Sequence, residues 1–164
     1  MSIQIKKILV AKDLSQESSK VIRYALELAS KFHAQVHVLH VMPTVDSSVL
    51  NMVALTMGAD KLAEFNAKNE AELAGQTKEQ LNKIIQDEAE LMKEEVKHPP
   101  QIEVHHGDPT SMILAVADRL DADMIILGSH SKGKLHYAFL GSVAEKILRK
   151  THRTVVIVPP HVGR

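Results

Sequence analysis

The chain has 164 residues, and its 20 lysine and arginine residues balance its 20 aspartate and glutamate residues, so the formal net charge is zero. This length suits one domain with a buried core, and the balanced charge gives no general attraction to nucleic acid or to a membrane surface. The sequence contains no cysteine, which excludes disulfides, thiolate metal ligands and cysteine nucleophiles. Tryptophan is also absent and other aromatic residues are few, so aromatic stacking platforms for single-stranded nucleic acid are not expected.

The N-terminal segment MSIQIKK lacks the apolar core of a signal peptide. No apolar run approaches the about 18 residues that a membrane-spanning helix needs. We therefore expect a cytoplasmic protein.

The first expected strand is residues 7–12 (KILVAK), an apolar run without polar alternation, as in a strand that is covered on both faces. Residues 13–15 follow as a turn, and helical spacing then begins. The expected apolar stripe of this helix is Val21, Ile22, Ala25, Leu26, Leu28, Ala29 and Phe32. The second expected strand is Gln35–Met42, which Pro43 ends.

Residues 44–100 predict an extended helical insertion between the second and third strands. The insertion starts with SSVLNMVALTMGAD and continues into a long helix through about Lys97, which Gly75 and Thr77 are expected to break in two. Its expected packed face is Leu62, Phe65, Leu73, Leu81, Ile84, Ile85, Leu91 and Met92. A crossover helix with an insertion is one interpretation, and a lid or partner-binding segment is the other.

A third strand, Gln101–His106, is expected to lead into a helix with clear start signals. Gly107 begins a turn, Asp108 is the expected N-cap, and Pro109 is the expected first helical residue. The side chains expected to point inward are Ile113, Val116, Ala117 and Leu120.

The last two expected strands are residues 124–127 and Thr154–Val158, with a helix over Ser142–Lys150 between them. At the start of this helix, Ser142-Val-Ala-Glu145 matches a capping box with Ser142 as the N-cap. Strands that alternate with helices predict βαβ units. We therefore predict an α/β fold: one domain over residues 1–164 with an open parallel sheet of five strands and helices on both faces.

Residues 123–146 join a buried strand, a glycine-containing basic loop and a capped helix, an arrangement that turns backbone amides toward a phosphate. From Gly128 the chain runs G-S-H-S-K-G-K-L, which matches a P-loop at every position except the last. Leu135 stands where a hydroxyl would hold Mg²⁺, and its apolar side chain cannot ligate that cation. The better helix start at Ser142 also argues against a P-loop.

A longer span, from Gly128 through Ser131 to Gly141 and Ser142, matches G-x-x-G-x9-G-[S/T] with serine at the middle glycine. Together with Asp13, LHVMP, HHGDP and TVVIVPP, this pattern resembles the universal stress protein family over nearly the whole chain. The resemblance implies a sheet in the order 3-2-1-4-5. In such a sheet the winding reverses between strands one and four, and ligands bind beyond their carboxyl ends.

The resemblance also implies an adenine nucleotide as ligand: ATP foremost, or AMP or another, with Mg²⁺ as a candidate companion. Asp13 would then face the base or ribose beside Ala11 and Lys12, and Val41 would meet adenine through its backbone. Gly128 would allow close backbone approach, and Gly141 and Ser142 would present amides, a hydroxyl and the helix end to phosphate. The other expected contacts are Leu127, His130, Ser131, Lys132, Gly133 and Val143. Structural alternatives exist for these residues: Asp13 as a turn residue or N-cap, Gly128 as a strand end, His130 as a surface residue, and Ser142 as a plain N-cap.

Ser131 departs from the family pattern, because nucleotide-binding members usually have glycine there. Serine at a positive φ costs on the order of 1–2 kcal/mol. A charge-assisted hydrogen bond from its hydroxyl to phosphate would contribute about 1.5–3 kcal/mol. These opposed terms predict an affinity change of about tenfold in either direction.

Dedicated catalysis is not expected, because the chain has no G-x-S-x-G motif and no assembled set of metal-binding carboxylates. His37 and His105 are a candidate metal pair, but no further ligand spacing completes a recognised set. The resemblance implies a regulatory stress-response protein that forms a homodimer through Thr154–Val158. The alternatives are a weak ATPase or phosphotransfer enzyme and a nucleotide-free protein-interaction member.

Overall fold

The structure is a computed structural model that describes residues 2–12, 19–42, 44, 47–93, 95–129 and 140–159. One parallel sheet of five strands has the order β3-β2-β1-β4-β5. The strands are β1 Lys7–Ala11, β2 Gln35–Met42, β3 Gln101–His106, β4 Met124–Gly128 and β5 Thr154–Val158. The predicted fold class and strand order are confirmed, and every predicted strand lies within one residue of its observed bounds.

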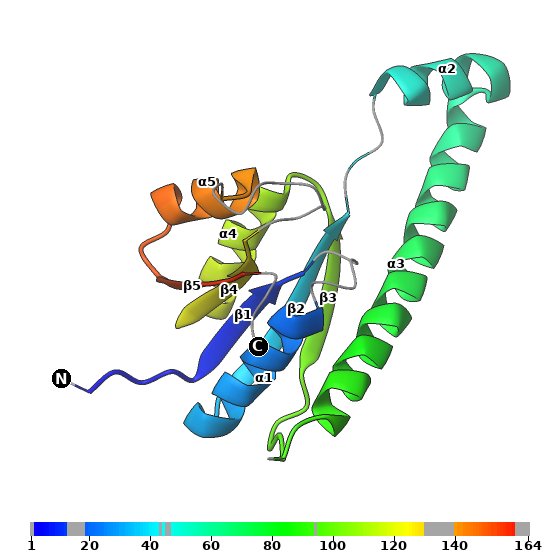
Figure 1. Cartoon of the computed structure of the whole chain (residues 1–164). Helices are drawn as coiled ribbons and strands as arrows, with labels where there is room; N and C mark the ends of the chain where they lie inside the picture. Colours follow the sequence, from blue (N-terminus) through cyan, green and yellow to red (C-terminus); the bar gives the residue numbers. More distant parts are fainter. Residues whose placement is uncertain are drawn as a thin grey trace.

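The sheet lies between two layers of helices (Figure 1). The helices are α1 Ser19–Phe32, α2 Ser47–Met57, α3 Ala59–Glu90, α4 Pro109–Leu120 and α5 Ser142–Lys150. Side chains of β1 alternate between two apolar cores, because successive residues of a strand point to opposite faces. Val10 packs with residues of α1 and α3, such as Leu26 and Ile85. Leu9 packs with Ile113 of α4 and with residues of α5.

The start of α4 has the predicted cap. Asp108 is the N-cap, its carboxylate accepts a hydrogen bond from the Ser111 amide at 2.9 Å, and Pro109 follows as the first helical residue. The predicted stripe of α1 is buried at five positions, but the prediction for Phe32 is wrong, since this side chain is 47% exposed at the end of the helix.

Helix α3 is a single helix of 32 residues. The predicted break at Gly75 and Thr77 is therefore wrong, and the helix ends at Glu90 rather than near Lys97. One glycine inside a helix costs only about 1 kcal/mol relative to alanine, which a long helix tolerates. The Thr77 side chain is buried, and its hydroxyl lies 3.7 Å from the sulfur of Met42, so this residue packs against the sheet. Among the described residues, no helix combines the length and the apolarity needed to cross a membrane.

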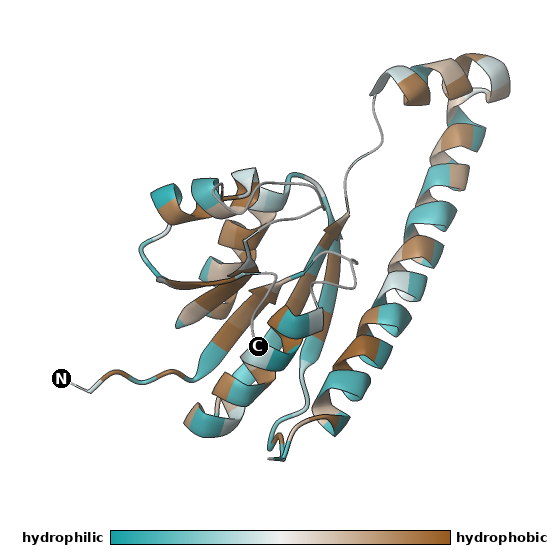
Figure 2. Cartoon of the chain, in the orientation of Figure 1, coloured by the Kyte–Doolittle hydropathy of each residue, from teal (hydrophilic) through white to brown (hydrophobic). Residues whose placement is uncertain are grey.

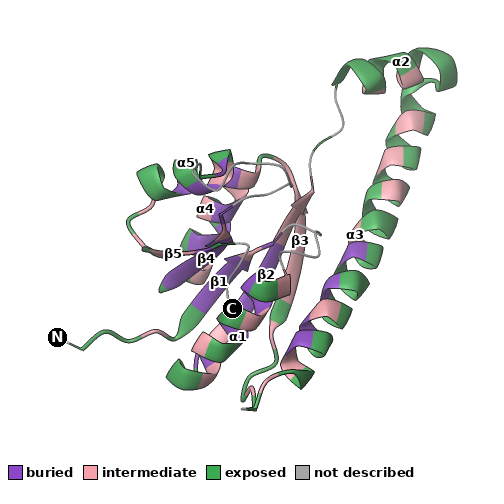
Figure 3. Ribbon diagram, viewed as in Figure 1, coloured by how far each residue is buried: buried purple, intermediate pink, exposed green. Residues whose placement is uncertain are grey.

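Only the second half of α3 packs on the sheet layer (Figure 3). Leu81 and Ile85 are buried, and the buried Glu88 carboxylate accepts a hydrogen bond from Arg23 of α1 at 2.8 Å. Residues 47–76, which we call the arm, comprise α2 and the first part of α3 and contain no buried residue. The predicted packed face is thus wrong for Phe65 and Leu73 of the arm, and also for Leu91.

The arm exposes several apolar side chains. Figure 2 shows hydrophobic residues along α2, at the end of α3 that lies away from the sheet. Met52 is 70% exposed and Leu55 is 89% exposed. The apolar side chains of the arm therefore contribute to neither of the two apolar cores.

Candidate functional site

The carboxyl ends of β1 and β4 meet at the centre of the sheet. Ala11 of β1 lies opposite Leu39 of β2 on one side and opposite Leu127 of β4 on the other. The chain leaves β1 through the buried Lys12 and leaves β4 through Gly128. Because the strand order reverses its direction between β1 and β4, the ends of these two strands mark the expected ligand-binding position of such a sheet, which we call the crevice.

Backbone hydrogen bonds connect the start of α5 to the ends of β4 and β5. The Ser129 amide donates to the Val158 carbonyl at 3.0 Å, and the Ser129 carbonyl accepts from the Gly141 amide at 2.7 Å. Both Ser129 and Gly141 are buried. These bonds hold the N-terminal end of α5, which carries a partial positive charge, beside the crevice.

The Gly141 amide is engaged with Ser129 in this arrangement, and its expected role as a phosphate donor stays a prediction. Ser142 and Val143 are the first two residues of α5. Amides at the first helical positions have no intrahelical acceptor. They are thus the amides of this segment best suited to an anion.

The predicted capping box is wrong by one residue. Gly141 is the N-cap, with an extended backbone at φ −60° and ψ 151°, and its carbonyl accepts from the Glu145 amide at 2.9 Å. Ser142 is consequently the first helical residue and is exposed. The Glu145 carboxylate accepts from Arg149 at 2.7 Å on the helix surface instead of reaching back to an N-cap.

The turn after β1 is also bonded to β2. The Lys12 amide donates to the Leu39 carbonyl at 2.9 Å. The Lys12 carbonyl lies 2.6 Å from Nδ1 of His40. His40 had no role in the sequence analysis, because its partner is 28 residues away and no local pattern connects the two.

The structure brings the described members of the predicted site to the carboxyl ends of three neighbouring strands and to the start of α5. These members are Ala11, Lys12, Val41, Leu127, Gly128, Gly141, Ser142 and Val143. Val41 lies near the end of β2, opposite His105 of β3. The predictions for Asp13, His130, Ser131, Lys132 and Gly133, and the P-loop interpretation of Leu135, lie outside the described residues.

A second polar group lies on β3 and α4, away from the crevice. The Glu103 carboxylate accepts hydrogen bonds from Arg119 and from Nε2 of His105, and the bond from Arg119 contributes most to lowering the pKa of Glu103 to about 2. Burial lowers the pKa of the nearby His37 imidazole. Among the described residues no three side chains form a cluster that could hold a metal ion, and His105 is bonded to Glu103 instead.

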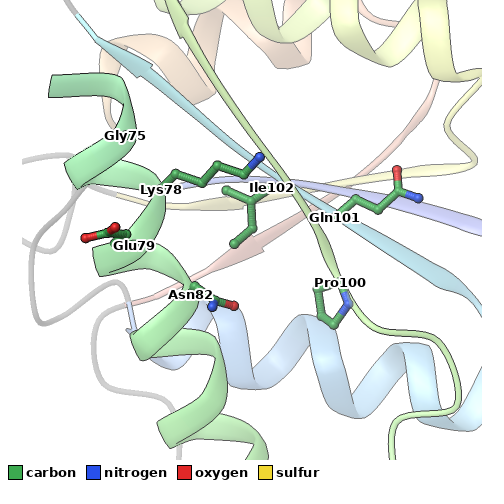
Figure 4. Close-up of a pocket in the computed structure, with 7 residues that line it drawn as sticks. All are labelled: Gly75, Lys78, Glu79, Asn82, Pro100, Gln101 and Ile102. Atoms are coloured by element: carbon green, nitrogen blue, oxygen red, sulfur yellow. The ribbon is translucent and has the colours of Figure 1, made fainter. Parts of the chain in front are cut away.

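A pocket of about 630 Å³ lies between α3 and β3 (Figure 4). Lys78, Glu79 and Asn82 of α3 line one side, and Gln101 and Ile102 line the other. All of these except the half-buried Ile102 are exposed. The pocket lies beside the edge strand β3, whereas the crevice lies at the centre of the sheet.

Comparison with known proteins connects this chain to a family. The universal stress protein MJ0577 of Methanocaldococcus jannaschii is 29% identical over 159 residues, which cover 96% of this chain and 97% of that protein. The solved structure of MJ0577 matches with a TM-score of 0.72 and 23% identity, covering 98% of this chain and all of that one.

Two further solved structures of the same fold contain nucleotides. A universal stress protein in complex with cAMP matches with a TM-score of 0.62 at 16% identity, covering 96% of this chain and 99% of that one. The Archaeoglobus fulgidus universal stress protein in complex with dAMP matches with a TM-score of 0.56 at 20% identity, covering 95% of this chain and 98% of that one. The model of the universal stress protein family matches residues 4–159. This chain therefore belongs to the universal stress protein family.

Proposed function

We propose that the protein binds an adenine nucleotide, with ATP as the foremost candidate, in the crevice between β1 and β4 and acts as a regulatory module of the stress response. The main supporting observation is the convergence of Lys12, Gly128 and the start of α5 at the point where the strand order reverses. Relatives of the same fold in complex with cAMP and dAMP support the adenine class of the ligand.

The proposed orientation places the base and ribose near β1 and β2 and the phosphates near α5. Asp13 accepts from the ribose hydroxyls, with Ala11 and Lys12 beside it, and the Val41 backbone meets adenine. The phosphates lie beside Gly128 and against the amides of Ser142 and Val143, and residues 130–133 are proposed as further contacts. A helix N-terminus and backbone amides at a strand end are a suitable environment for phosphate, with or without Mg²⁺.

Calorimetric titration with ATP, AMP and cAMP tests this proposal. Wild-type protein should bind at least one of the three, and Gly141→Val should abolish the heat of binding, because its side chain adds bulk at a buried position directly before α5. Gly75→Val is the matched control: Gly75 is exposed in α3, and an added Cβ meets no atom within 4 Å. An absence of heat at millimolar nucleotide, or an unchanged affinity in Gly141→Val, would contradict the proposed site.

Two alternative functions are tested by measurements of ATP turnover and of nucleotide binding. A weak ATPase would show Mg²⁺-dependent turnover that Asp13→Ala removes. A nucleotide-free interaction protein is favoured by the exposed apolar side chains of the arm, and it would give no heat with any nucleotide.

The edge position of β5, whose outer side pairs with no other strand in the described part of the chain, supports a homodimer. An exposed edge strand offers unpaired backbone groups, and pairing with a second copy across a two-fold axis covers them. Val155, Val156 and Ile157 of β5 are only half-buried in the single chain. Sedimentation equilibrium should give twice the 18.2 kDa chain mass, and a monomer at all concentrations would exclude this dimer.

A further inference from the structure

We infer that His40 is a positioning residue for the nucleotide site: its imidazole holds the Lys12 carbonyl and thereby fixes the backbone of Lys12 at the end of β1. This inference rests on the proposed function, in which Lys12 is itself a contact of the nucleotide. His40 itself has no contact with the nucleotide in this proposal.

The evidence is the hydrogen bonding at the end of the β1–β2 pairing. The register of the two strands ends with Ala11 opposite Leu39. Lys12 lies one residue beyond, and its amide still donates to the Leu39 carbonyl at 2.9 Å. Its carbonyl lies 2.6 Å from His40 Nδ1, and a carbonyl oxygen can only accept, so Nδ1 carries the hydrogen. Both backbone polar groups of Lys12 are thus bonded to β2.

The burial of Lys12 makes this bond important. Only 4% of the residue is exposed. A buried backbone carbonyl that loses its hydrogen-bond partner destabilises the folded state, unless it rotates toward another donor or toward water. That rotation changes ψ of Lys12 and moves its peptide group away from β2. The imidazole therefore keeps the Lys12 backbone in one orientation before ligand arrives.

The side-chain chemistry suggests a conservative replacement. Asparagine carries an N–H donor about as far from its Cα as Nδ1 of histidine, so His40→Asn can still donate to the Lys12 carbonyl. Leucine has a similar length but no donor. His98 is exposed and lies outside the helices and strands, so His98→Leu is a matched control for the loss of an imidazole.

The experiment has two parts, one without ligand and one with ATP. In the first, hydrogen exchange of the Lys12 amide is compared in wild type, His40→Leu, His40→Asn and His98→Leu. The Lys12 amide keeps its own acceptor, Leu39, so its exchange reports how firmly the Lys12 backbone is held: loss of the carbonyl bond predicts exchange faster by about three- to tenfold in His40→Leu, and rates near wild type in the other two variants. In the second, ATP titration should show a dissociation constant raised by about three- to tenfold in His40→Leu only.

The outcomes separate the inference from the proposed function. Wild-type behaviour of His40→Leu in both parts of the experiment would overturn the positioning role. A His40→Asn variant as impaired as His40→Leu would overturn it too. If no variant and no wild type binds ATP while the Lys12 amide follows the expected pattern, His40 does hold the turn, and the proposed ATP site is wrong. Equal losses in His98→Leu would show an unspecific effect and would also overturn the inference.

Discussion

Replacement of Leu81 by alanine tests how far α3 packs on the sheet layer. Leu81 is 0% exposed, whereas Leu73, two turns earlier on the same helix, is 52% exposed. Leu81→Ala should lower the free energy of unfolding by about 2–5 kcal/mol, because it removes buried methyl groups and leaves a cavity. Leu73→Ala should cost about 1 kcal/mol or less, because half of that side chain is already in water.

The two substitutions make the same chemical change in the same helix, so their helix-propensity costs are equal and the difference reports burial. Urea unfolding followed by circular dichroism measures it. With a slope of about 2 kcal/mol per molar, Leu81→Ala should move the midpoint by about 1–2.5 M. Equal midpoint shifts for the two variants would refute the conclusion that the sheet layer covers only the second half of α3.

Three further predictions concern pH and helix stability. The folded-state pKa of Glu103, about 2, lies below its ordinary value of 4.5, so its contribution is present above pH 4.5 and is lost as the pH falls toward 2. Because the partner Arg119 is partly exposed, solvent screens the pair, and we reduce this contribution to about 1–2 kcal/mol. Glu103→Gln should therefore flatten the dependence of unfolding free energy on pH between 4.5 and about 2. The folded-state pKa of His37 is also lowered, from 6.5, chiefly by burial, so neutral His37 stabilises the fold above pH 6.5 and this stability is lost below it. His37→Leu should therefore remove part of the decline in unfolding free energy as the pH falls below 6.5, and an unchanged decline would contradict this assignment. Gly75→Ala should raise the unfolding free energy by up to about 1 kcal/mol, because Gly75 is exposed inside α3 and has open space around its Cα; a lower thermal midpoint would disagree.

The sequence predicted the sheet well because its signals are local. Apolar runs bounded by turn residues predicted the strands, and Asp108 followed by Pro109 predicted the start of α4. Strand order followed from the family resemblance, and the position of the crevice follows from strand order. Ser142 and Gly141 show the limit of this approach, because a capping motif can shift by one residue when the preceding glycine is extended.

The packing of the arm could not be predicted, because apolar spacing indicates a helix face but not what covers it. Leu73 and Leu81 fit the same helical stripe, and only the tertiary structure separates the exposed residue from the buried one. The bond from His40 to Lys12 was missed for a related reason. It joins the ends of two parallel strands, and no sequence motif around either residue indicates the other as its partner.

The most direct test of the ATP site is a nuclear magnetic resonance titration that follows backbone amides as ATP is added. If ATP binds between β1 and β4, Lys12, Gly128, Ser142 and Val143 should shift together and saturably, since these residues lie on both sides of the crevice. Saturable shifts confined to Lys78, Asn82 and Gln101 would place the ligand in the pocket beside β3 and contradict the proposed site. A spectrum unchanged at millimolar ATP would contradict it as well.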